Sequence, residues 1–340
     1  MGRRGLRLLR SRYIPRVVST GNLVAPCYHI VTDEWPTHVR HLYRWRDIRA
    51  FTIDLDYLLQ HFKPLSLNDI QAYIAADKPI PDGSLFLSFD DGFSEMSNVV
   101  APLCRQKGIP ATFFLTTGFL DNRILGYRHK ASLLIDACRQ RGPAASQAVT
   151  SKLSCLFPSL PGYPDGPRQM LLSVGYRQRQ VLDECAALLE VDFDEYLRTA
   201  QPYLTRDQVR DLLSDGFSIG GHSIDHPRYA ELTLDEQLSQ TRGCMEDLQR
   251  QFQLPVKAFA FPFVSDGVSE RFYEVMFNNR IADLAFCIGQ MPKKDSQKAV
   301  QRFGVESDVA HSLPDLLTRQ FEGRLRQTVA NWRRRVSISS

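Results

Sequence analysis

Short apolar runs alternate along the chain with segments whose apolar residues recur at helical spacing. The runs have the length and the branched or aromatic content of buried strands, and they lie at 23–29, 84–89, 111–115, 217–222, 256–261 and 284–288. The helical pattern occupies 46–62, 98–108, 205–216, 233–252 and 269–277. Strands that alternate with helices form a parallel sheet covered by those helices, and about seven strands are enough for a barrel. We therefore expect an α/β barrel.

The alternation is interrupted between residues 123 and 204, where no clear strand is present. A compact domain rarely contains a loop of that length without secondary structure, so we expect a mainly helical insertion that forms a lid or a substrate wall. We assign residues 22–318 to one barrel domain that carries this insertion. Residues 1–21 form a basic N-terminal extension, and residues 319–340 form a basic C-terminal helix or tail.

Charge is unevenly distributed along the 340 residues, whose formal net charge is +4. Residues 1–16 carry six arginines and no acid, and residues 319–340 carry a net +5, which leaves −7 for residues 17–318. Basic ends on an acidic body suit contact with an anionic membrane surface, although solvated tails explain the same pattern. Nucleic acid is a poorer candidate because no aromatic–basic interleaving or nucleic-acid motif is present.

The expected location follows from the cysteines and the N-terminus. The seven cysteines are an odd number without a C-x-x-C pair, and we interpret them as reduced thiols of a reducing compartment. The N-terminus has no apolar core of signal-peptide length, and no stretch reaches the roughly 18 to 20 apolar residues of a membrane span. We expect a cytoplasmic protein that can associate peripherally with a membrane.

Polar side chains follow two of the apolar runs, at the strand ends where a parallel barrel carries its chemistry. Asp90 and Asp91 end the segment LFLSFDD, and His222 and His226 lie in GGHSIDHP. If the histidines occupy one helical turn, both imidazoles point the same way and can reach one ion. Two histidines and one aspartate form a metal site with positions open for water and substrate. A capped turn at the histidines and a simple Asp-Gly turn are the structural alternatives.

The segments SFDDGF, GGHSIDHPRYAELT and FAFPF occur in this order, and together they are much more specific than any one alone. With ATFFLTTGFLD, they resemble the polysaccharide deacetylases, the NodB-homology or carbohydrate esterase family 4 domain. The resemblance covers roughly residues 22–122 and 203–305. It implies a distorted (β/α)7 barrel that removes N-acetyl groups from an amino-sugar polysaccharide or from its oligosaccharide or lipid-linked precursor.

The resemblance also implies roles for individual residues. Family members bind a divalent ion with the second aspartate and the two histidines, here Asp91, His222 and His226. The ion is usually Zn²⁺, with Co²⁺, Ni²⁺ or Mn²⁺ as alternatives. The first aspartate, here Asp90, is the general base for the attacking water, whose pKa a bound Zn²⁺ lowers to about 7.

A general acid must then protonate the departing amine, and most family members use a histidine near the C-terminal end of the domain. His311 is the candidate there, but no strand leads into it. We choose His29 instead, because it ends an apolar run and one branch of the family takes its acid from the first segment. A buried histidine bonded to backbone is the alternative for His29. By family precedent, the backbone N–H of Phe263, beside Pro262, completes an oxyanion hole.

Two family motifs are altered in this chain. The third motif usually has an arginine two residues before its proline, where it braces the base, and Ala260 stands there instead. Arg302 follows a predicted strand and is our candidate to replace that charge, with a surface or helix-facing salt bridge as the alternative. We also assign Phe263, Pro262, Arg302 and Asp266 to substrate binding, although an aspartate in a segment such as SDG more often belongs to a simple turn. The fourth motif is not recognisable.

Three functions remain open at this point. The first is a metal-dependent deacetylase of an acetylated amino-sugar glycan. The second is a hydrolase of the same fold that acts on acetyl esters or non-sugar amides. The third is a glycan-binding module without catalysis, which the presence of a base beside a metal triad argues against.

Overall fold

The structure is a computed structural model that describes residues 23–156, 166–306 and 312–320. The predicted N-terminal extension, His311 and nearly all of the predicted C-terminal tail lie outside the described residues. Within the described ranges, no helix combines the length and the apolar character needed to cross a bilayer.

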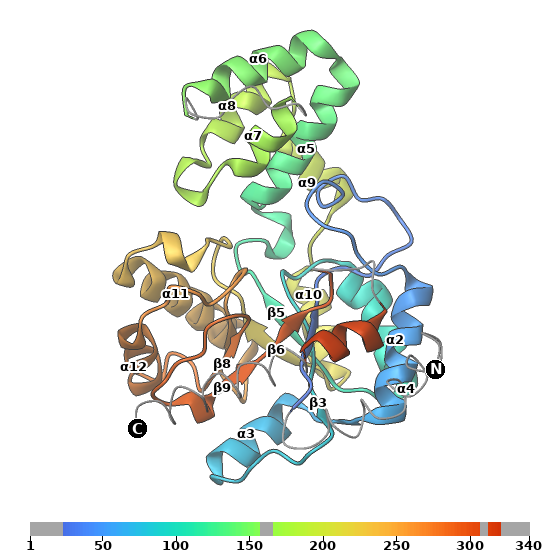
Figure 1. Cartoon of the computed structure of the whole chain (residues 1–340), viewed down its shortest axis with the longest axis vertical. Coiled ribbons are helices and arrows are strands. Elements are labelled where there is room, and N and C mark those ends of the chain that lie inside the picture. The colour runs from blue at the N-terminus through green and yellow to red at the C-terminus, as the bar shows by residue number, and fades with distance from the viewer. Residues whose placement is uncertain (1–22, 157–165, 307–311, 321–340) are drawn as a thin grey trace, which may run out of the picture.

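An eight-stranded parallel sheet forms the centre of the molecule (Figure 1). Its order is β10-β1-β4-β5-β6-β7-β8-β9, and each pair of neighbours is parallel. The strands are β1 Pro26–Tyr28, β4 Leu87–Phe89, β5 Ala111–Leu115, β6 Ser218–Gly221, β7 Ala258–Ala260, β8 Leu284–Cys287, β9 Ala299–Gln301 and β10 Phe303–Gly304. The shorter strands β2 Lys63–Pro64 and β3 Ser84–Leu85 form a separate parallel pair.

A single extended segment nearly closes this sheet into a barrel. β9 pairs with β8, β10 pairs with β1, and only Arg302 separates the two strands. The N–H of Arg302 donates to the carbonyl of Cys287 at 2.7 Å, and the N–H of Phe303 donates to Ala25 at 3.1 Å. The segment thus crosses from one sheet edge to the other, so the strands fill seven positions around the barrel. The predicted (β/α)7 barrel is confirmed.

Helices surround the barrel and bury their apolar sides against it (Figure 1). Three of them begin with capping boxes, which are formed by Ser66 with Asp69, Thr205 with Gln208, and Thr233 with Glu236. The α-helices outside the insertion are α2 Ile48–His61, α3 Leu67–Ala75, α4 Ala101–Lys107, α10 Arg206–Ser214, α11 Leu234–Phe252 and α12 Glu270–Asn278, with a further helix at 313–320. Single turns lie at Met96–Val100, Leu120–Asn122, Tyr176–Gln178, Tyr229–Glu231 and Ser296–Lys298.

Five helices lie between β5 and α10 in the chain and form a block that stands off one end of the barrel (Figure 1). They are α5 Tyr127–Arg141, α6 Pro143–Ser154, α7 Pro167–Ser173, α8 Val181–Leu188 and α9 Phe193–Ala200. Their apolar faces bury a core of their own, which includes Leu134, Val149, Leu171 and Leu182. Because this block follows the carboxyl end of β5, it lies over the strand ends where the candidate site residues are found.

Candidate active site

The two carboxylates lie where β4 turns sharply out of the barrel. The N–H of Asp90 still donates to the carbonyl of Tyr28 on β1, at 2.9 Å, so Asp90 is held as a continuation of the strand. Asp91 and Gly92 follow with φ angles of 76° and 87°, in the left-handed region that favours glycine. A non-glycine residue with such a φ costs of order 1–3 kcal/mol, so the surrounding structure must enforce this turn at Asp91. The turn directs the two adjacent side chains to different partners.

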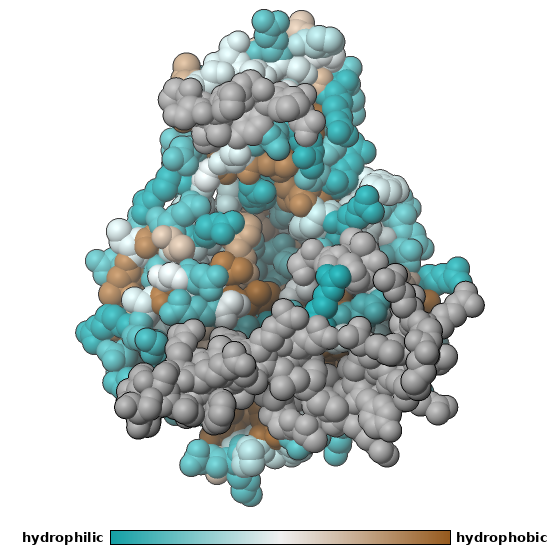
Figure 2. Space-filling view, viewed as in Figure 1, coloured by the Kyte–Doolittle hydropathy of each residue, from teal (hydrophilic) through white to brown (hydrophobic). Residues whose placement is uncertain are grey.

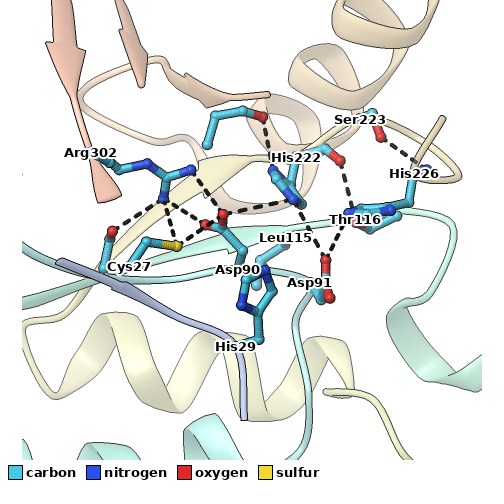
Figure 3. A network of polar contacts seen from close by, with 12 residues as sticks. Cys27, His29, Asp90, Asp91, Leu115, Thr116, His222, Ser223, His226 and Arg302 are labelled. Carbon is cyan, nitrogen blue, oxygen red and sulfur yellow. Dashed lines mark hydrogen bonds and ion pairs between the residues drawn. The ribbon is translucent and has the colours of Figure 1, made fainter. Parts of the chain in front are cut away.

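Asp90 forms a bidentate ion pair with the fully buried guanidinium of Arg302 (Figure 3). Nη1 of Arg302 lies 2.7 Å from Oδ1 of Asp90, and Nη2 lies 2.8 Å from Oδ2. Nη1 also donates to the hydroxyl of Ser88 at 3.1 Å, while the guanidinium stacks on Phe114 at 5.0 Å. Burial raises the pKa of Asp90, but Arg302 and His222 outweigh it and bring that pKa to about 2. Asp90 is therefore ionised at neutral pH.

This contact is the one required by the hypothesis that Arg302 replaces the arginine missing from position 260. The replacement reaches Asp90 from the strand that closes the barrel, on the segment between β9 and β10. Burying an unpaired carboxylate or guanidinium is costly. The bidentate pair bonds both oxygens of Asp90 and both terminal nitrogens of Arg302, while Nε of Arg302 has no hydrogen-bond partner among the described residues.

His222 and His226 lie in a loop, so the predicted helical turn is wrong. Ser223 and His226 have φ angles of 73° and 63°, which no right-handed helix allows. The loop bonds instead to the segment after β5, where the N–H of Gly118 donates to the carbonyl of Ile224 at 2.7 Å. A Cβ at Gly118 would lie 2.5 Å from that carbonyl oxygen, so only glycine permits this approach. The loop still brings the imidazoles together, with ring centroids 5.0 Å apart.

Three ligand atoms converge at this point without hydrogen-bond partners (Figure 3). Oδ1 of Asp91 lies 3.0 Å from Nε2 of His226 and 3.5 Å from Nε2 of His222. Nδ1 of His222 bonds to the carbonyl of Ala260 at 2.9 Å, which leaves the lone pair on Nε2. Burial lowers the pKa of His222 to about 4, so its imidazole is neutral. Buried polar atoms are rarely unpartnered, and this donor set fits a divalent ion.

His29 pairs with Glu306, a residue that the sequence did not reveal as part of the site. The carboxylate of Glu306 accepts from the N–H of His29 at 2.6 Å and contacts Nδ1 of the ring at 3.0 Å. Burial lowers the pKa of His29, but the negative charges of Glu306, Asp91 and Asp90 together have the larger, opposite effect and raise it to about 9. His29 is thus an imidazolium at neutral pH, with Nδ1 committed to Glu306. The pairing of Cys27 with Gly304 in register places residues 29 and 306 opposite each other, but only the structure gives that register.

A cavity of about 640 Å³ lies over these groups, between the barrel and the helical block. Figure 2 shows the surface hollowed between these two parts. His29, Asp91, His226, Phe263 and Arg302 are among its lining residues, so most of the predicted site residues meet here.

Two predicted substrate-binding residues are not among those that line this cavity. Pro262 is buried, and Asp266 is exposed. Oδ1 of Asp266 accepts a hydrogen bond from the N–H of Gln290 at 2.7 Å, as a residue that stabilises a turn would. The insertion contributes Tyr127, Arg128 and His129 to the lining, and none of them was predicted from the sequence as a site residue.

Residues 77–276, more than half of the chain, match the sequence profile of the family described as polysaccharide deacetylase. A comparison with curated protein sequences gives no significant match. Two solved structures are similar in fold. The Streptococcus pyogenes deacetylase PplD in complex with acetate has 13% identity and a TM-score of 0.53, over 87% of this chain and 96% of that one. IcaB from Ammonifex degensii has 15% identity and a TM-score of 0.53, over 88% of this chain and 98% of that one. The profile match shows that the chain belongs to the polysaccharide deacetylase family of hydrolases.

Proposed function

We propose that this protein removes N-acetyl groups from an amino-sugar glycan, or from its oligosaccharide or lipid-linked precursor, with the help of a divalent ion. The observation that carries the proposal is the convergence of three unpartnered ligand atoms beside a carboxylate that Arg302 keeps ionised. Membership of the family supports the reaction class.

Asp91, His222 and His226 would hold the ion, and their oxygen and nitrogen donors suit Zn²⁺, with Co²⁺, Ni²⁺ or Mn²⁺ as alternatives. When bound, such an ion acts as a Lewis acid and lowers the pKa of a water molecule to about 7.

Asp90 is the general base in this proposal. Each carboxylate oxygen has two acceptor sites, so Asp90 can bond to Arg302 and still accept the proton of a water molecule. The water oxygen then forms a bond to the acetamide carbon. The backbone N–H of Phe263 donates to the carbonyl oxygen as negative charge develops on it. Arg302 orients the base without itself reaching the substrate's acyl carbon.

His29 is the general acid. Because Glu306 binds Nδ1–H, the proton on Nε2 is the one that passes to the sugar nitrogen as the C–N bond breaks. The products are acetate and a free amine. Asp90 releases its proton to solvent and His29 takes one up, which restores both groups.

The pairing of His29 with Glu306 favours catalysis over simple glycan binding, because a binding module has no need for an imidazole held protonated beside a base. It favours an amide over an ester, because an amine leaves only after protonation. We further propose that residues 22–318 act as one catalytic domain, in which the insertion forms one wall of the substrate cavity. The protein would act in the cytoplasm, at a membrane that carries the lipid-linked precursor.

A screen of metal-loaded protein over acetylated oligosaccharides tests this function, with loss of one acetyl group scored by mass spectrometry. We expect loss from an acetylated amino sugar, abolished in Asp90→Asn and retained in Asp207→Asn, which changes an exposed aspartate on α10. Loss from acetyl esters alone would favour the alternative hydrolase. No loss from any acetylated glycan would contradict the proposal.

A further inference from the structure

Two arginines of the cavity wall are less well neutralised than the other cationic groups there. Arg302 is paired with Asp90, and His29 is paired with Glu306. By contrast, Arg128 forms no salt bridge with any described residue. Among the described residues, the one ion pair of Arg228 is a 3.6 Å contact between its Nε and Oε1 of Glu231.

Glu231 does not neutralise this pair of arginines well. Its Oε1 lies 3.6 Å from Nε of Arg228, while its Oε2 accepts a hydrogen bond from the N–H of Tyr176 at 3.0 Å. Glu231 contributes one negative charge beside the two positive charges of Arg128 and Arg228, so this part of the wall keeps a net positive charge.

Both arginines lie close to the catalytic centre. The guanidinium of Arg228 stacks on the ring of Phe263 at 4.9 Å, and Phe263 contacts the ring of His226 at 4.6 Å. One aromatic ring thus separates Arg228 from a candidate metal ligand. Arg128 follows Tyr127, whose ring lies 6.5 Å from the same Phe263.

The side chain of Arg128 is held in place by one hydrogen bond and keeps other N–H donors available. Its Nη1 donates to the carbonyl of Leu172, which fixes the side chain against the insertion. A guanidinium has five N–H donors, so this bond leaves others for a ligand in the cavity. Burial, the largest effect, and the charge of Arg228 lower the pKa of Arg128, and they outweigh the opposite effects of Tyr127 and Glu231.

We propose that the wall formed by Arg128 and Arg228 binds an anionic group of the substrate, a carboxylate or a phosphate, while the acetamide lies at the metal site. This inference rests on the proposed deacetylation for the identity of the rest of the substrate. A carboxylate or phosphate accepts two hydrogen bonds from one guanidinium and relieves the repulsion between two of them. The enzyme would therefore select an acidic or phosphorylated glycan over a neutral one.

The test compares three trisaccharides of N-acetylglucosamine: the neutral sugar, its 6-carboxylate and its 6-phosphate. Their dissociation constants are measured by calorimetry on the wild-type protein, Arg128→Gln, Arg228→Gln and Arg139→Gln. Arg139 is the matched control, because it is an exposed arginine of the same helix α5 and does not line the cavity. Arg228→Lys separates charge from stacking, and thermal unfolding of each variant verifies the fold.

We expect at least one anionic trisaccharide to bind the wild-type protein about 10-fold more tightly than the neutral one, with a preference that weakens as salt rises. Arg128→Gln and Arg228→Gln should reduce that preference to less than about 2-fold, while Arg139→Gln keeps it and Arg228→Lys keeps most of it. Preference for the phosphate alone identifies a phosphorylated glycan, and preference for the carboxylate alone identifies an acidic sugar.

The absence of any anion preference in the wild-type protein would overturn the inference, whether or not acetate is released. A preference that survives in both glutamine variants would overturn it as well. If the anionic sugars bind as expected but none is deacetylated by metal-loaded protein, the proposed function fails and the anion site stands.

Discussion

Substitution of Glu306 by glutamine is the sharpest test of how the proposed general acid is tuned. Glutamine keeps a carbonyl oxygen that can accept from the backbone N–H and from Nδ1 of His29, but it removes the negative charge. The orientation of the imidazole is then retained, and its pKa loses its largest upward contribution.

The size of the effect follows from that pKa. In the wild-type protein the pKa of His29 is raised from 6.5 to about 9, against the effect of burial. Loss of the Glu306 charge lowers the pKa of His29 toward its ordinary value of 6.5, because burial is then opposed by Asp91 and Asp90 alone. At about pH 8 an imidazole with a pKa near 9 is about 90% protonated, and one with a pKa near 6.5 about 3%, a difference of roughly 30-fold in active enzyme. A bound cation lowers the pKa of His29 in both the wild-type protein and Glu306→Gln. The quantity tested is therefore the difference in this pKa between the two proteins.

The assay is acetate release as a function of pH. We expect the basic limb of the kcat/KM profile to move down by about two pH units in Glu306→Gln, with little loss near pH 6. Glu274→Gln on α12, which changes a glutamate outside the cavity, should leave the profile unchanged. A uniform loss of activity at every pH, with the basic limb in place, would refute the assignment of His29 as a general acid tuned by Glu306.

The pH dependence of the unfolding free energy gives an independent measurement of the pair formed by His29 and Glu306. The pKa of His29 is raised in the folded state, so its stabilisation is fully present below pH 6.5 and disappears as the pH rises through about 9. The raised pKa corresponds to at most about 3 kcal/mol, reduced by solvent because 26% of the imidazole is exposed. Urea unfolding of metal-free protein should show a gap between wild type and Glu306→Gln near pH 6 that vanishes above about pH 10.

Three further predictions concern the metal site, the buried ion pair and the loop. His226→Ala should weaken Zn²⁺ binding by at least about 100-fold in calorimetry, because it removes one of the three proposed ligands. Arg302→Gln should cost about 3–5 kcal/mol of unfolding free energy in urea, because it leaves Asp90 buried without its partner. Gly118→Ala should destabilise the protein by about 1–3 kcal/mol and weaken Zn²⁺ binding, since its Cβ would press on the loop that carries both histidines. Wild-type Zn²⁺ affinity in the Gly118→Ala variant would show that the loop relaxes without moving the ligands.

The barrel could be predicted because its signals are local. Each predicted strand contains a strand of the sheet, and the predicted helices 205–216 and 233–252 appear as α10 and α11 with their expected caps. Apolar periodicity and capping act over a few residues, so they are readable from the chain. The crossing of the barrel seam at Arg302 is not local, because it depends on pairing with both β1 and β8.

The candidate site was predicted only in part, because some of its contacts join segments that are far apart in the sequence. The residues in the sequence motifs do converge in the structure. The helical turn predicted for His222 and His226 from their four-residue spacing was wrong, because backbone hydrogen bonds to the segment after β5 hold this stretch as a loop. Glu306 lies 277 residues from His29 in the chain, and no sequence pattern joins them. Arg128 sits in an insertion whose position over the barrel the sequence could not specify.

The segment that joins β9 and β10 has a consequence for the synthesis of this protein. β1 emerges among the first described residues, yet its partner β10 and Arg302, which pairs with Asp90, are made some 275 residues later. Until then the nascent chain has an open sheet edge and an aspartate without its counter-ion. If Asp90 is the base, as proposed, a ribosome-bound intermediate that stops before Arg302 would lack hydrolytic activity even with all three proposed metal ligands translated. Catalysis would then be acquired at the step that closes the barrel.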